Sequence, residues 1–388
     1  MSQSYRIGIV GFGIAGGALA ILLARQGHQV TLLERAPVLG PVGAGFLLQP
    51  TGQRVLRGMG LLEPIIAQSA TVLGLHARTH RGRTLVNLRY PAEPARGVHR
   101  GVIFNLLRET VEREGVDIRT NAEVASYQGE PGRVFIHTAE GKEHGAFDFV
   151  AACDGSRSVL RGLLNRHSQP VDYDYGALWG NGRCEALTNL VKEVTRSNAR
   201  LTGLLPTGNG RCAFFWGLQR AELEVIRGRS FAEWSTEVLS LFPEAAQPLA
   251  EIGAHENLVF GGFLHEFPRR TYDGRVILLG DAAHAMSPHL GQGANLSLLD
   301  AECLARHLAS EPTVELALRR HTRERFRQTR FFSILSRVLG PFFQGRSRIL
   351  GMGRDWVLPI LNAVPWFRRQ MELSLAGSKT GFFDRVWG

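Results

Sequence analysis

The chain has 388 residues, 44% of them hydrophobic, so it can bury a large core and is long enough for two domains. It contains no run of about twenty apolar residues, and its first residues are too polar for a signal peptide, so we expect a cytoplasmic protein without a membrane span. The four cysteines lack paired spacing, which predicts no cysteine-ligated metal. The net charge of +10 comes mainly from arginine, since lysine occurs only at positions 142, 192 and 379.

A glycine-rich turn follows the first apolar run, residues 7–10. Gly11 permits the sharp turn, Gly13 lets the backbone approach a pyrophosphate, and Gly16 lets the next helix pack close to the sheet. That helix offers free backbone N–H groups to the pyrophosphate. A second strand ends at Glu34, where a carboxylate usually accepts ribose hydroxyls. The residues predicted to contact a dinucleotide are Gly11, Gly13, Ile14, Ala15, Gly16, Glu34 and Arg35.

Strands and helices alternate up to about residue 165, which predicts an α/β fold with a Rossmann-like, mostly parallel sheet. From 171 to 269 the pattern indicates an inserted mixed β-sheet domain, with a helix over Phe231–Leu241. Helical sequence then dominates, broken by Pro341, Pro359 and Pro365. The predicted domains are a discontinuous nucleotide-binding domain (1–75, 99–170 and 270–335), a substrate-binding sheet domain (76–98 and 171–269) and a C-terminal helical segment (336–388).

A second motif begins where the strand-like segment 147–150 ends. Asp154-Gly155 is by itself ordinary turn chemistry. Ser158 and Arg161 follow, which places a hydroxyl and a guanidinium one helical turn apart on the same face.

A third motif, Gly280-Asp281, follows a short apolar strand, and Asp281 could accept the ribitol hydroxyls of a flavin. Gly291, Gly293 and Asn295 then begin a helix whose free N–H groups can face an electron-rich ring edge. A helix cap followed by a glycine-rich loop would explain single residues of this string but not all of it.

The densest basic stretch, residues 319–330, has helical propensity and only one aromatic residue. No recognised nucleic-acid module surrounds it, so a solvated helix face is favoured over nucleic-acid binding.

The three motifs, in this order, resemble the single-component FAD-dependent aromatic hydroxylases, which include p-hydroxybenzoate hydroxylase and salicylate hydroxylase. The resemblance spans nearly the whole chain. Residues 43–46 with Gln49-Pro50 resemble the family's loop beside the flavin, and Arg100 resembles its FAD-contacting arginine. The further FAD contacts that the resemblance implies are Gly45, Arg100, Asp154, Gly155, Arg157, Gly280, Asp281, Gly291, Gly293, Ala294 and Asn295.

The resemblance also implies a reaction: NADH or NADPH docks transiently and reduces FAD, and a C4a-hydroperoxyflavin formed with O2 hydroxylates a phenolic or quinolone-like ring. The residues implied at the reacting part of the flavin are Pro288, Gly291, Gln292 and Gly293. The inserted sheet forms a wall of the substrate cavity in relatives, so the expected pocket residues are Phe214, Trp216, Pro288 and His289. Candidates for a base are His265, His284, His289 and Tyr272.

The tail, residues 354–377, resembles ubiquinone-biosynthesis hydroxylases and alkylquinolone monooxygenases. Core packing is favoured over membrane contact for its apolar residues, because proline interrupts the amphipathic pattern. These residues are Trp356, Val357, Leu358, Ile360, Leu361, Trp366 and Phe367. A monomer or homodimer is expected.

Two other enzyme classes stay open. A reductase or dehydrogenase could share this fold. A flavin-dependent halogenase is less favoured, because the chain lacks a Trp-x-Trp-x-Ile-Pro string and has few lysines. A non-enzymatic flavoprotein is the least favoured alternative.

Overall fold

The parallel sheet that carries the first motif is assembled from distant segments. The computed structural model describes residues 4–40, 44–164, 170–185, 189–345 and 347–382, and this sheet has the strand order β18-β19-β12-β1-β2-β8. β1 pairs in parallel with β12 and with β2, whereas β18 at the edge runs antiparallel to β19. The strands are β1 Arg6–Val10, β2 Gln29–Leu33, β8 Asp117–Arg119, β12 Phe149–Ala152, β18 Tyr272–Asp273 and β19 Val276–Leu278.

Alternate side chains of these strands enter two separate cores, as the pleat of a strand requires. Ile7 and Ile9 of β1 point into a core of helices, whereas Val10 points into a core against a small antiparallel sheet. The helices of the first core include α1 Ile14–Arg25, α2 Pro50–Gly58, α3 Leu62–Ile66, α4 Arg100–Arg113 and α10 Gly293–Ser310. The second core is covered by β9 Val124–Glu130, β10 Arg133–Thr138, β11 Glu143–Phe147, α5 Val159–Leu164 and α9 Asp281–His284.

The inserted sheet has the order β17-β13-β16-β15-β14-β5-β6. It is mixed, because β5 and β14 pair in parallel whereas their other neighbours are antiparallel. The strands are β5 Gly74–Thr79, β6 Thr84–Arg89, β13 Val171–Arg183, β14 Leu190–Arg196, β15 Arg200–Gly208, β16 Arg211–Gln219 and β17 Val259–His265.

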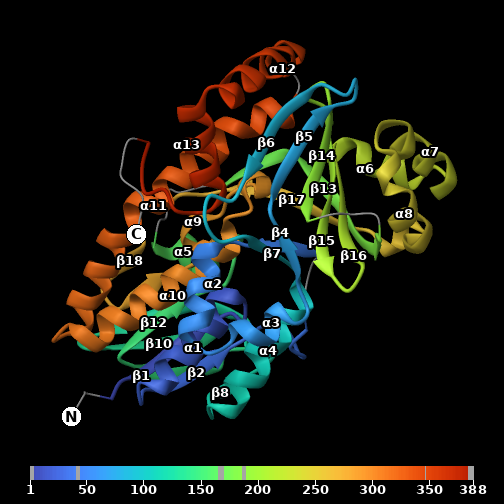
Figure 1. Cartoon of the computed structure of the whole chain (residues 1–388). Coiled ribbons are helices and arrows are strands. Elements are labelled where there is room, and N and C mark those ends of the chain that lie inside the picture. The colour runs from blue at the N-terminus through green and yellow to red at the C-terminus, as the bar shows by residue number, and fades with distance from the viewer. Residues whose placement is uncertain (1–3, 41–43, 165–169, 186–188, 346, 383–388) are drawn as a thin grey trace.

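Helices cover the face of the inserted sheet that is turned away from the parallel sheet (Figure 1). They are α6 Leu223–Arg227, α7 Phe231–Leu241 and α8 Ala246–Ile252, with the short turns η1 Arg220–Glu222, η2 Pro243–Ala245 and η3 His255–Asn257. The helix predicted over Phe231–Leu241 is confirmed as α7.

A small sheet connects the two large ones (Figure 1). Its order is β3-β7-β4, with β3 Gly45–Leu48, β4 Ala70–Val72 and β7 Ala95–His99. Val72 and Ala95 share a buried cluster with Leu205 and Ala213 of the inserted sheet. The α/β fold with an inserted mixed sheet is therefore confirmed.

Three helices follow α10: α11 Val314–Phe343, α12 Arg348–Ala363 and α13 Pro365–Leu375. The prediction that Pro341 and Pro359 interrupt the helices is wrong, because both lie inside helices, close to their C-terminal ends. Pro365 does begin α13, where the missing N–H of proline costs no hydrogen bond. The predicted domain limit at residue 336 falls inside the continuous helix α11. No helix in the described part of the chain is long and apolar enough to cross a membrane.

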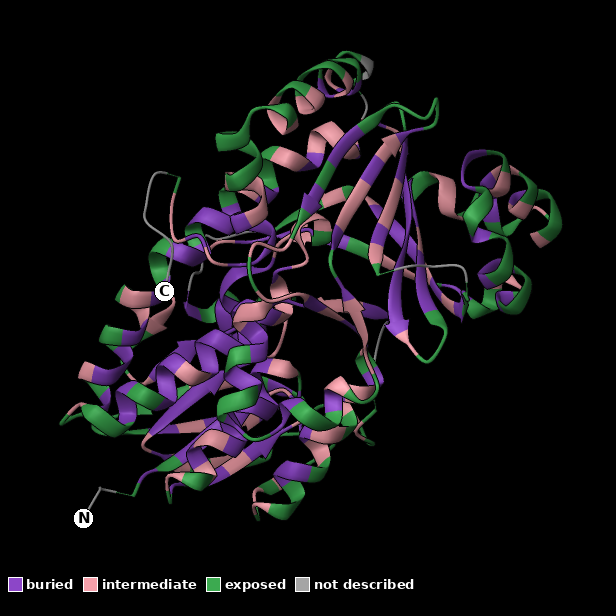
Figure 2. Ribbon diagram, in the orientation of Figure 1, coloured by how far each residue is buried: buried purple, intermediate pink, exposed green. Residues whose placement is uncertain are grey.

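Much of α12 and α13 is exposed (Figure 2), and most of their large apolar residues are among the exposed ones, which corrects the prediction that these residues form core. Ile349 is 80% exposed, Trp356 64% and Ile360 62%. The inner side of α12 instead uses Gly351, which lies against the backbone of Asn198, and the buried Arg354. Because a glycine and an arginine make the inner contact, the bulky apolar residues are left on the outside. The exposed apolar residues of this surface are Ile349, Met352, Trp356, Val357, Ile360, Val364, Trp366 and Phe367, and Leu358 and Leu361 are partly buried.

A buried carboxylate on α10 joins three segments. Asp300 Oδ2 accepts hydrogen bonds from the backbone N of Gly280 at 3.0 Å and from His284 Nε2 at 2.6 Å. Asp300 Oδ1 accepts from Arg325 Nε of α11 at 2.7 Å. Although burial alone would raise its pKa, His284 and Arg325 hold the pKa of Asp300 well below its usual range. One ionised group thus fixes the Gly280 turn, α10 and α11 together.

Removing this carboxylate would leave Arg325 buried without its counter-ion. We expect Asp300→Ala to lower the free energy of unfolding by about 3–5 kcal/mol, as measured by urea denaturation. The control is Glu302→Ala, which breaks the more exposed Arg54–Glu302 pair on the same helix and should cost at most about 1 kcal/mol. Equal losses in the two variants would contradict the role given to Asp300.

Candidate functional site

The first and second motifs are in van der Waals contact. Gly11 has a φ of +97°, and a Cβ there would lie 2.5 Å from the carbonyl oxygen of Cys153. A Cβ on Gly16 would lie 2.1 Å from the carbonyl oxygen of Gly11. Both glycines are therefore required by close backbone approach within the turn and toward β12.

Gly13 differs from its neighbours, because a Cβ there would meet no atom within 4 Å. The open space lies in front of the N-terminus of α1, where backbone N–H groups can bind a pyrophosphate. Glu34 holds the turn in place: its Oε2 accepts from the backbone N of Phe12 at 2.7 Å and its Oε1 from that of Ala36 at 2.9 Å. Each carboxylate oxygen has a further lone pair for a ribose hydroxyl. These residues fit the ADP half of FAD.

Asp154, two residues after the end of β12, has one buried oxygen without a hydrogen-bond partner among the described residues. Its Oδ2 accepts from the backbone N of Leu160 at 3.4 Å, whereas its Oδ1 is buried and has no hydrogen-bond partner among the described residues. Burial raises the pKa of this carboxyl, against hydrogen bonds from Ser158 and the backbone. Gly155 beside it has a φ of +82°, and open space surrounds the position of its missing Cβ. A buried acceptor beside open space fits the dinucleotide that the sequence predicts here.

Arg161 ties the second motif to the third. Its side chain is 4% exposed, and Nη1 donates to the carbonyls of Asp281 and Ala282, each at 3.3 Å. Nη2 donates to the carbonyl of Ser156 at 2.6 Å. The guanidinium that the sequence places beside Ser158 therefore links two segments of backbone.

The third motif also touches the first. Gly280 has a φ of +58°, and a Cβ on it would lie 2.8 Å from Ser297 Oγ and 3.0 Å from the Cβ of Ala15. Asp281 is exposed, and its Oδ1 would lie 3.6 Å from a Cβ on Gly293, the first residue of α10. The Asp281 carboxylate is thus free to accept sugar hydroxyls beside a helix N-terminus.

The turn before α10 corrects one prediction. Gly291 lies in the left-handed region, with a φ of +61°, but its N–H donates to the carbonyl of Pro288 at 2.9 Å and is not free. The first bond from α10 to its cap joins Leu296 N to Gln292 O. The amides of Gly293, Ala294 and Asn295 precede it and form the positive end of the helix. These three amides are the backbone donors that this turn could offer to a flavin ring.

Gln292 and Asn295 use their side chains for support. Gln292 is 2% exposed, and its Nε2 donates to the carbonyls of Ser374 and Leu375 at the end of α13. Asn295 accepts from the backbone N of Gln49 at 2.8 Å and donates to the carbonyls of Leu47 and Gly291. Both side chains position the loop, so a contact with the flavin there would come from the backbone.

The remaining predicted FAD contacts differ in how far they are exposed. Arg35, Arg100 and Arg157 are exposed, and the backbone N of Arg100 donates to the carbonyl of Ala44 at 3.1 Å. A Cβ on Gly45 would lie 2.4 Å from Thr207 and 3.0 Å from Ala213, so this glycine lets β3 approach the inserted sheet. Gly43 of the same segment lies outside the described residues. Ile14 is half-buried at the start of α1.

The pocket residues predicted on β16 are wrong. Phe214 and Trp216 are 0% and 1% exposed, and their rings pack on Trp234 of α7 with centroids 6.2 Å and 6.1 Å apart. They face away from the parallel sheet. Because side chains alternate along a strand, Ala213, Phe215 and Gly217 lie on the opposite face, which is turned toward the parallel sheet and is called the inward face below.

Among the candidate bases, His289 lies nearest the flavin loop, beside the exposed Pro288 in the turn η4 Pro288–Leu290. Its ring lies 5.8 Å from Phe263 and 6.1 Å from Phe343, and its Nδ1 bonds to Ser287 Oγ at 2.9 Å. Burial lowers the pKa of His289 to about 4, so the ring is neutral at neutral pH.

The other candidate bases have structural surroundings. His284 bonds to Asp300, and Tyr272 lies on the edge strand of the parallel sheet. His265 faces Ser333 Oγ at 3.3 Å, and burial lowers its pKa to about 4.

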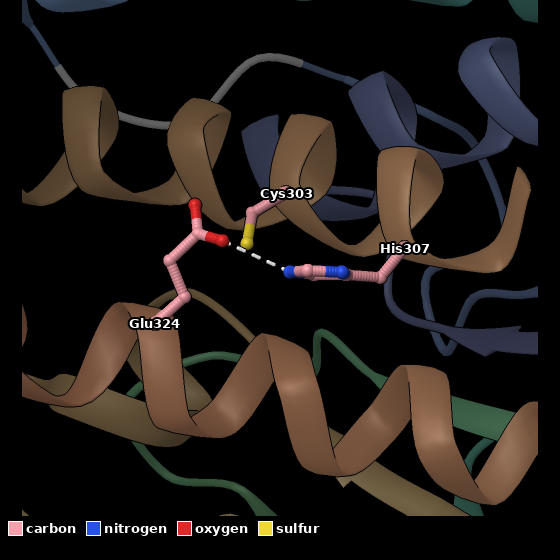
Figure 3. Close-up of side chains that lie close together, drawn as sticks. All are labelled: Cys303, His307 and Glu324. Atoms are coloured by element: carbon pink, nitrogen blue, oxygen red, sulfur yellow. Dashed lines mark hydrogen bonds and ion pairs between the residues drawn. The ribbon is translucent and has the colours of Figure 1, made fainter. Parts of the chain in front are cut away.

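Cys303 and His307 of α10 face Glu324 of α11, and their candidate ligand atoms lie within 4.8 Å of one another (Figure 3). Glu324 accepts from His307 Nε2 at 2.9 Å and from Arg306 Nη2 at 2.5 Å. Burial, together with Glu324, raises the pKa of the Cys303 thiol, which disfavours the thiolate that a metal requires. The cluster is an ion-paired contact between two helices, and we assign no metal to it.

Comparison with known proteins identifies the family, since residues 4–325 match the model described as FAD binding domain. The chain belongs to this family. It is 28% identical over 376 residues to aurachin C monooxygenase/isomerase of Stigmatella aurantiaca, covering 94% of this chain and 96% of the relative. It is 30% identical over 347 residues to salicylate hydroxylase of Pseudomonas putida, covering 78% and 77%. The solved structure of PqsL from Pseudomonas aeruginosa has a TM-score of 0.80 at 23% identity, covering 91% and 99%.

FAD is therefore the cofactor, and the protein is an FAD-dependent monooxygenase. The geometry of the three motifs agrees with this cofactor, because the backbone segments that carry them are in contact. These segments hold the open space beside Gly13, the unpaired oxygen of Asp154 and the carboxylate of Asp281. Asp300 is the residue of this assembly that the sequence analysis missed. Its only signal was one carboxylate within an otherwise apolar stretch of α10.

Gly13→Val tests the placement of the ADP half. The valine side chain would enter the open space without meeting protein, so the variant should fold yet retain less than about one-tenth of the wild-type FAD. FAD content is read from absorbance and folding from thermal unfolding. The control is Gly58→Val, which also points into open space, at the end of α2. A Gly13→Val protein with a full complement of FAD would place the pyrophosphate elsewhere.

Proposed function

We propose that the protein hydroxylates an aromatic small molecule, phenolic or quinolone-like, using O2 and NADH or NADPH. The observation that supports this best is the convergence of the three FAD motifs at the N-terminus of α10, next to the inward face of the inserted sheet. Gly291 lies against Leu47 of β3, and Leu47 packs on the cluster that contains Leu205 and Ala213. A flavin held by the motifs would lie between this loop and that sheet face.

When bound, FAD supplies the redox chemistry that links a reduced nicotinamide to oxygen. The chain contributes binding, orientation and electrostatics. The amides of Gly293, Ala294 and Asn295 present the positive end of α10, which favours the electron-rich form of a ring placed there. The aromatic rings of Phe263, His289 and Phe343 pack beside the same loop and help to exclude water.

The test is NADH- and NADPH-dependent oxygen uptake by the purified yellow protein, with and without phenols, hydroxybenzoates and alkylquinolones. We expect ligand-stimulated uptake and a product heavier by one oxygen atom, read by mass spectrometry. Hydrogen peroxide without an oxygenated product from any ligand would instead favour the reductase alternative. The nicotinamide that gives the higher kcat/KM identifies the reductant.

We also propose that the exposed apolar surface of α12 and α13 contacts an anionic lipid surface. Its exposed apolar residues recur at helical spacing, which is typical of an interfacial helix. Arginines border it: Arg368 and Arg369 are exposed beside Phe367, and Arg83 lies 4.6 Å from the ring centroid of Trp356. A two-fold contact between copies would bring these like charges together, whereas anionic headgroups would neutralise them.

Co-sedimentation with vesicles of phosphatidylglycerol and phosphatidylcholine tests this contact. We expect binding to the anionic vesicles and at least about tenfold weaker binding of the variant I349S/I360S, since it removes two of the most exposed apolar side chains. Val225→Ser on α6, where Val225 is 66% exposed, is the control and should bind like the wild type. A concentration-dependent dimer that I349S/I360S abolishes, without vesicle binding, would assign the surface to a second copy.

A further inference from the structure

One row of side chains on the inward face of the inserted sheet remains accessible between two buried rows. The strand register places Glu193, Gly203, Phe215 and Trp179 side by side across β14, β15, β16 and β13. Glu193, Phe215 and Trp179 are all partly exposed. The rings of Phe215 and Trp179 lie 5.2 Å apart, and the absent side chain of Gly203 makes room for Phe215.

The neighbouring rows are covered by different parts of the chain. On one side, Val191, Leu205 and Ala213 are at most 6% exposed and pack with the small sheet that carries Gly45. On the other side, Thr195 and Leu201 are 0% and 7% exposed. Arg354 Nη2 donates to Thr195 Oγ1 at 2.9 Å, and Gln344 lies against Gly217. The accessible row is therefore a strip of open sheet between the flavin-side small sheet and the C-terminal helices.

Among the residues that the strand register aligns in this row, Glu193 has the only charged side chain. No described residue forms a hydrogen bond or an ion pair with its carboxylate. Burial raises the pKa of Glu193 to about 7. An unpaired carboxylate on an otherwise apolar surface costs stability unless a partner binds it, so its position here points to a ligand.

The charged groups around Glu193 are engaged elsewhere. On the adjacent inward row, Arg354 pairs with Asp355. His289 is neutral, as its low pKa shows. On the other face of the sheet, Lys192 and His76 are directed away, because side chains alternate along β14 and β5. A negatively charged substrate group at this strip would therefore meet a carboxylate and, among these neighbouring described residues, no free cation.

We propose that Glu193 contacts the substrate and selects aromatic rings that carry a hydroxyl or ring N–H donor over rings that carry a carboxylate. The carboxylate oxygen accepts the donor's hydrogen, and the ring stacks on Phe215 and Trp179. This inference rests on the proposed function, since it names the class of ring that the enzyme hydroxylates. It also separates this chain from relatives such as salicylate hydroxylase, whose named substrate bears a carboxylate.

The test compares ligands that differ by one carboxylate. Dissociation constants of phenol, salicylate and hydroxyquinoline are measured by flavin absorbance changes on the FAD-loaded wild type and on Glu193→Gln and Glu193→Ala. We expect the wild type to bind phenol and hydroxyquinoline more tightly than salicylate. Glu193→Gln should weaken the binding of phenol and hydroxyquinoline by roughly tenfold to a hundredfold, because a neutral amide oxygen replaces the charged acceptor, and should improve the binding of salicylate.

Glu224→Gln, on the outward helix α6 where the Glu224 side chain is 80% exposed, is the matched control and should bind all three ligands like the wild type. FAD content and unfolding temperature show whether each Glu193 variant is folded. Tighter binding of salicylate than of phenol by the wild type, unchanged binding in Glu193→Gln, or no binding of any ligand would overturn the proposal. Selective binding of donors without an oxygenated product would support Glu193 and count against the proposed hydroxylation.

Discussion

The buried charge of Asp300 is the constraint on which the cofactor half depends. A carboxylate this deep is tolerable only when its lone pairs are filled, and here a backbone amide, an imidazole and a guanidinium fill them. Because the amide belongs to Gly280, the same interaction holds the turn that presents Asp281. Because the guanidinium belongs to α11, it also anchors the helix from which the C-terminal region continues. Function and stability are therefore coupled through one side chain that need not touch the cofactor.

Close contacts between backbone segments also hold the three FAD motifs together. Gly11 and Gly16 allow β1, α1 and β12 to meet, and Gly280 meets Ala15 of the first turn. Arg161 then joins the second motif to the third through backbone carbonyls. Three motifs more than a hundred residues apart in sequence thus share one rigid frame. Gly13, by contrast, has free space, which is why it can be changed without disturbing that frame.

Features of the fold and site that local sequence patterns determine can be predicted from the sequence, whereas features that depend on contacts between distant segments cannot. The glycine turn, Glu34 and α7 follow from local pattern, and the fold class follows from the alternation of elements. The pocket prediction for Phe214 and Trp216 failed because a strand has two faces and a shift of one residue exchanges them. The burial expected for Trp356 and Ile360 failed because α12 docks through Gly351 and Arg354, which no hydrophobicity pattern indicates. The N–H of Gly291 is used in a local turn and is not free, and the roles of Asp300 and Glu193 follow from their neighbours in space.

In the proposed site, the flavin side and the substrate side differ in charge, and this difference affects how reactive the substrate ring is. The N-terminus of α10 presents partial positive charge where a flavin ring would lie, while the strip on the inserted sheet offers one carboxylate and a neutral imidazole stands nearby. A ring that donates its O–H or N–H to Glu193 gains electron density, because the shared proton moves toward the carboxylate. Such a ring becomes a better nucleophile toward an electrophilic oxygen. A carboxylate on the ring would need a cation as its partner, whereas Arg354, which donates to Thr195 in the adjacent row, already pairs with Asp355. The same residue that selects the substrate would therefore also activate it.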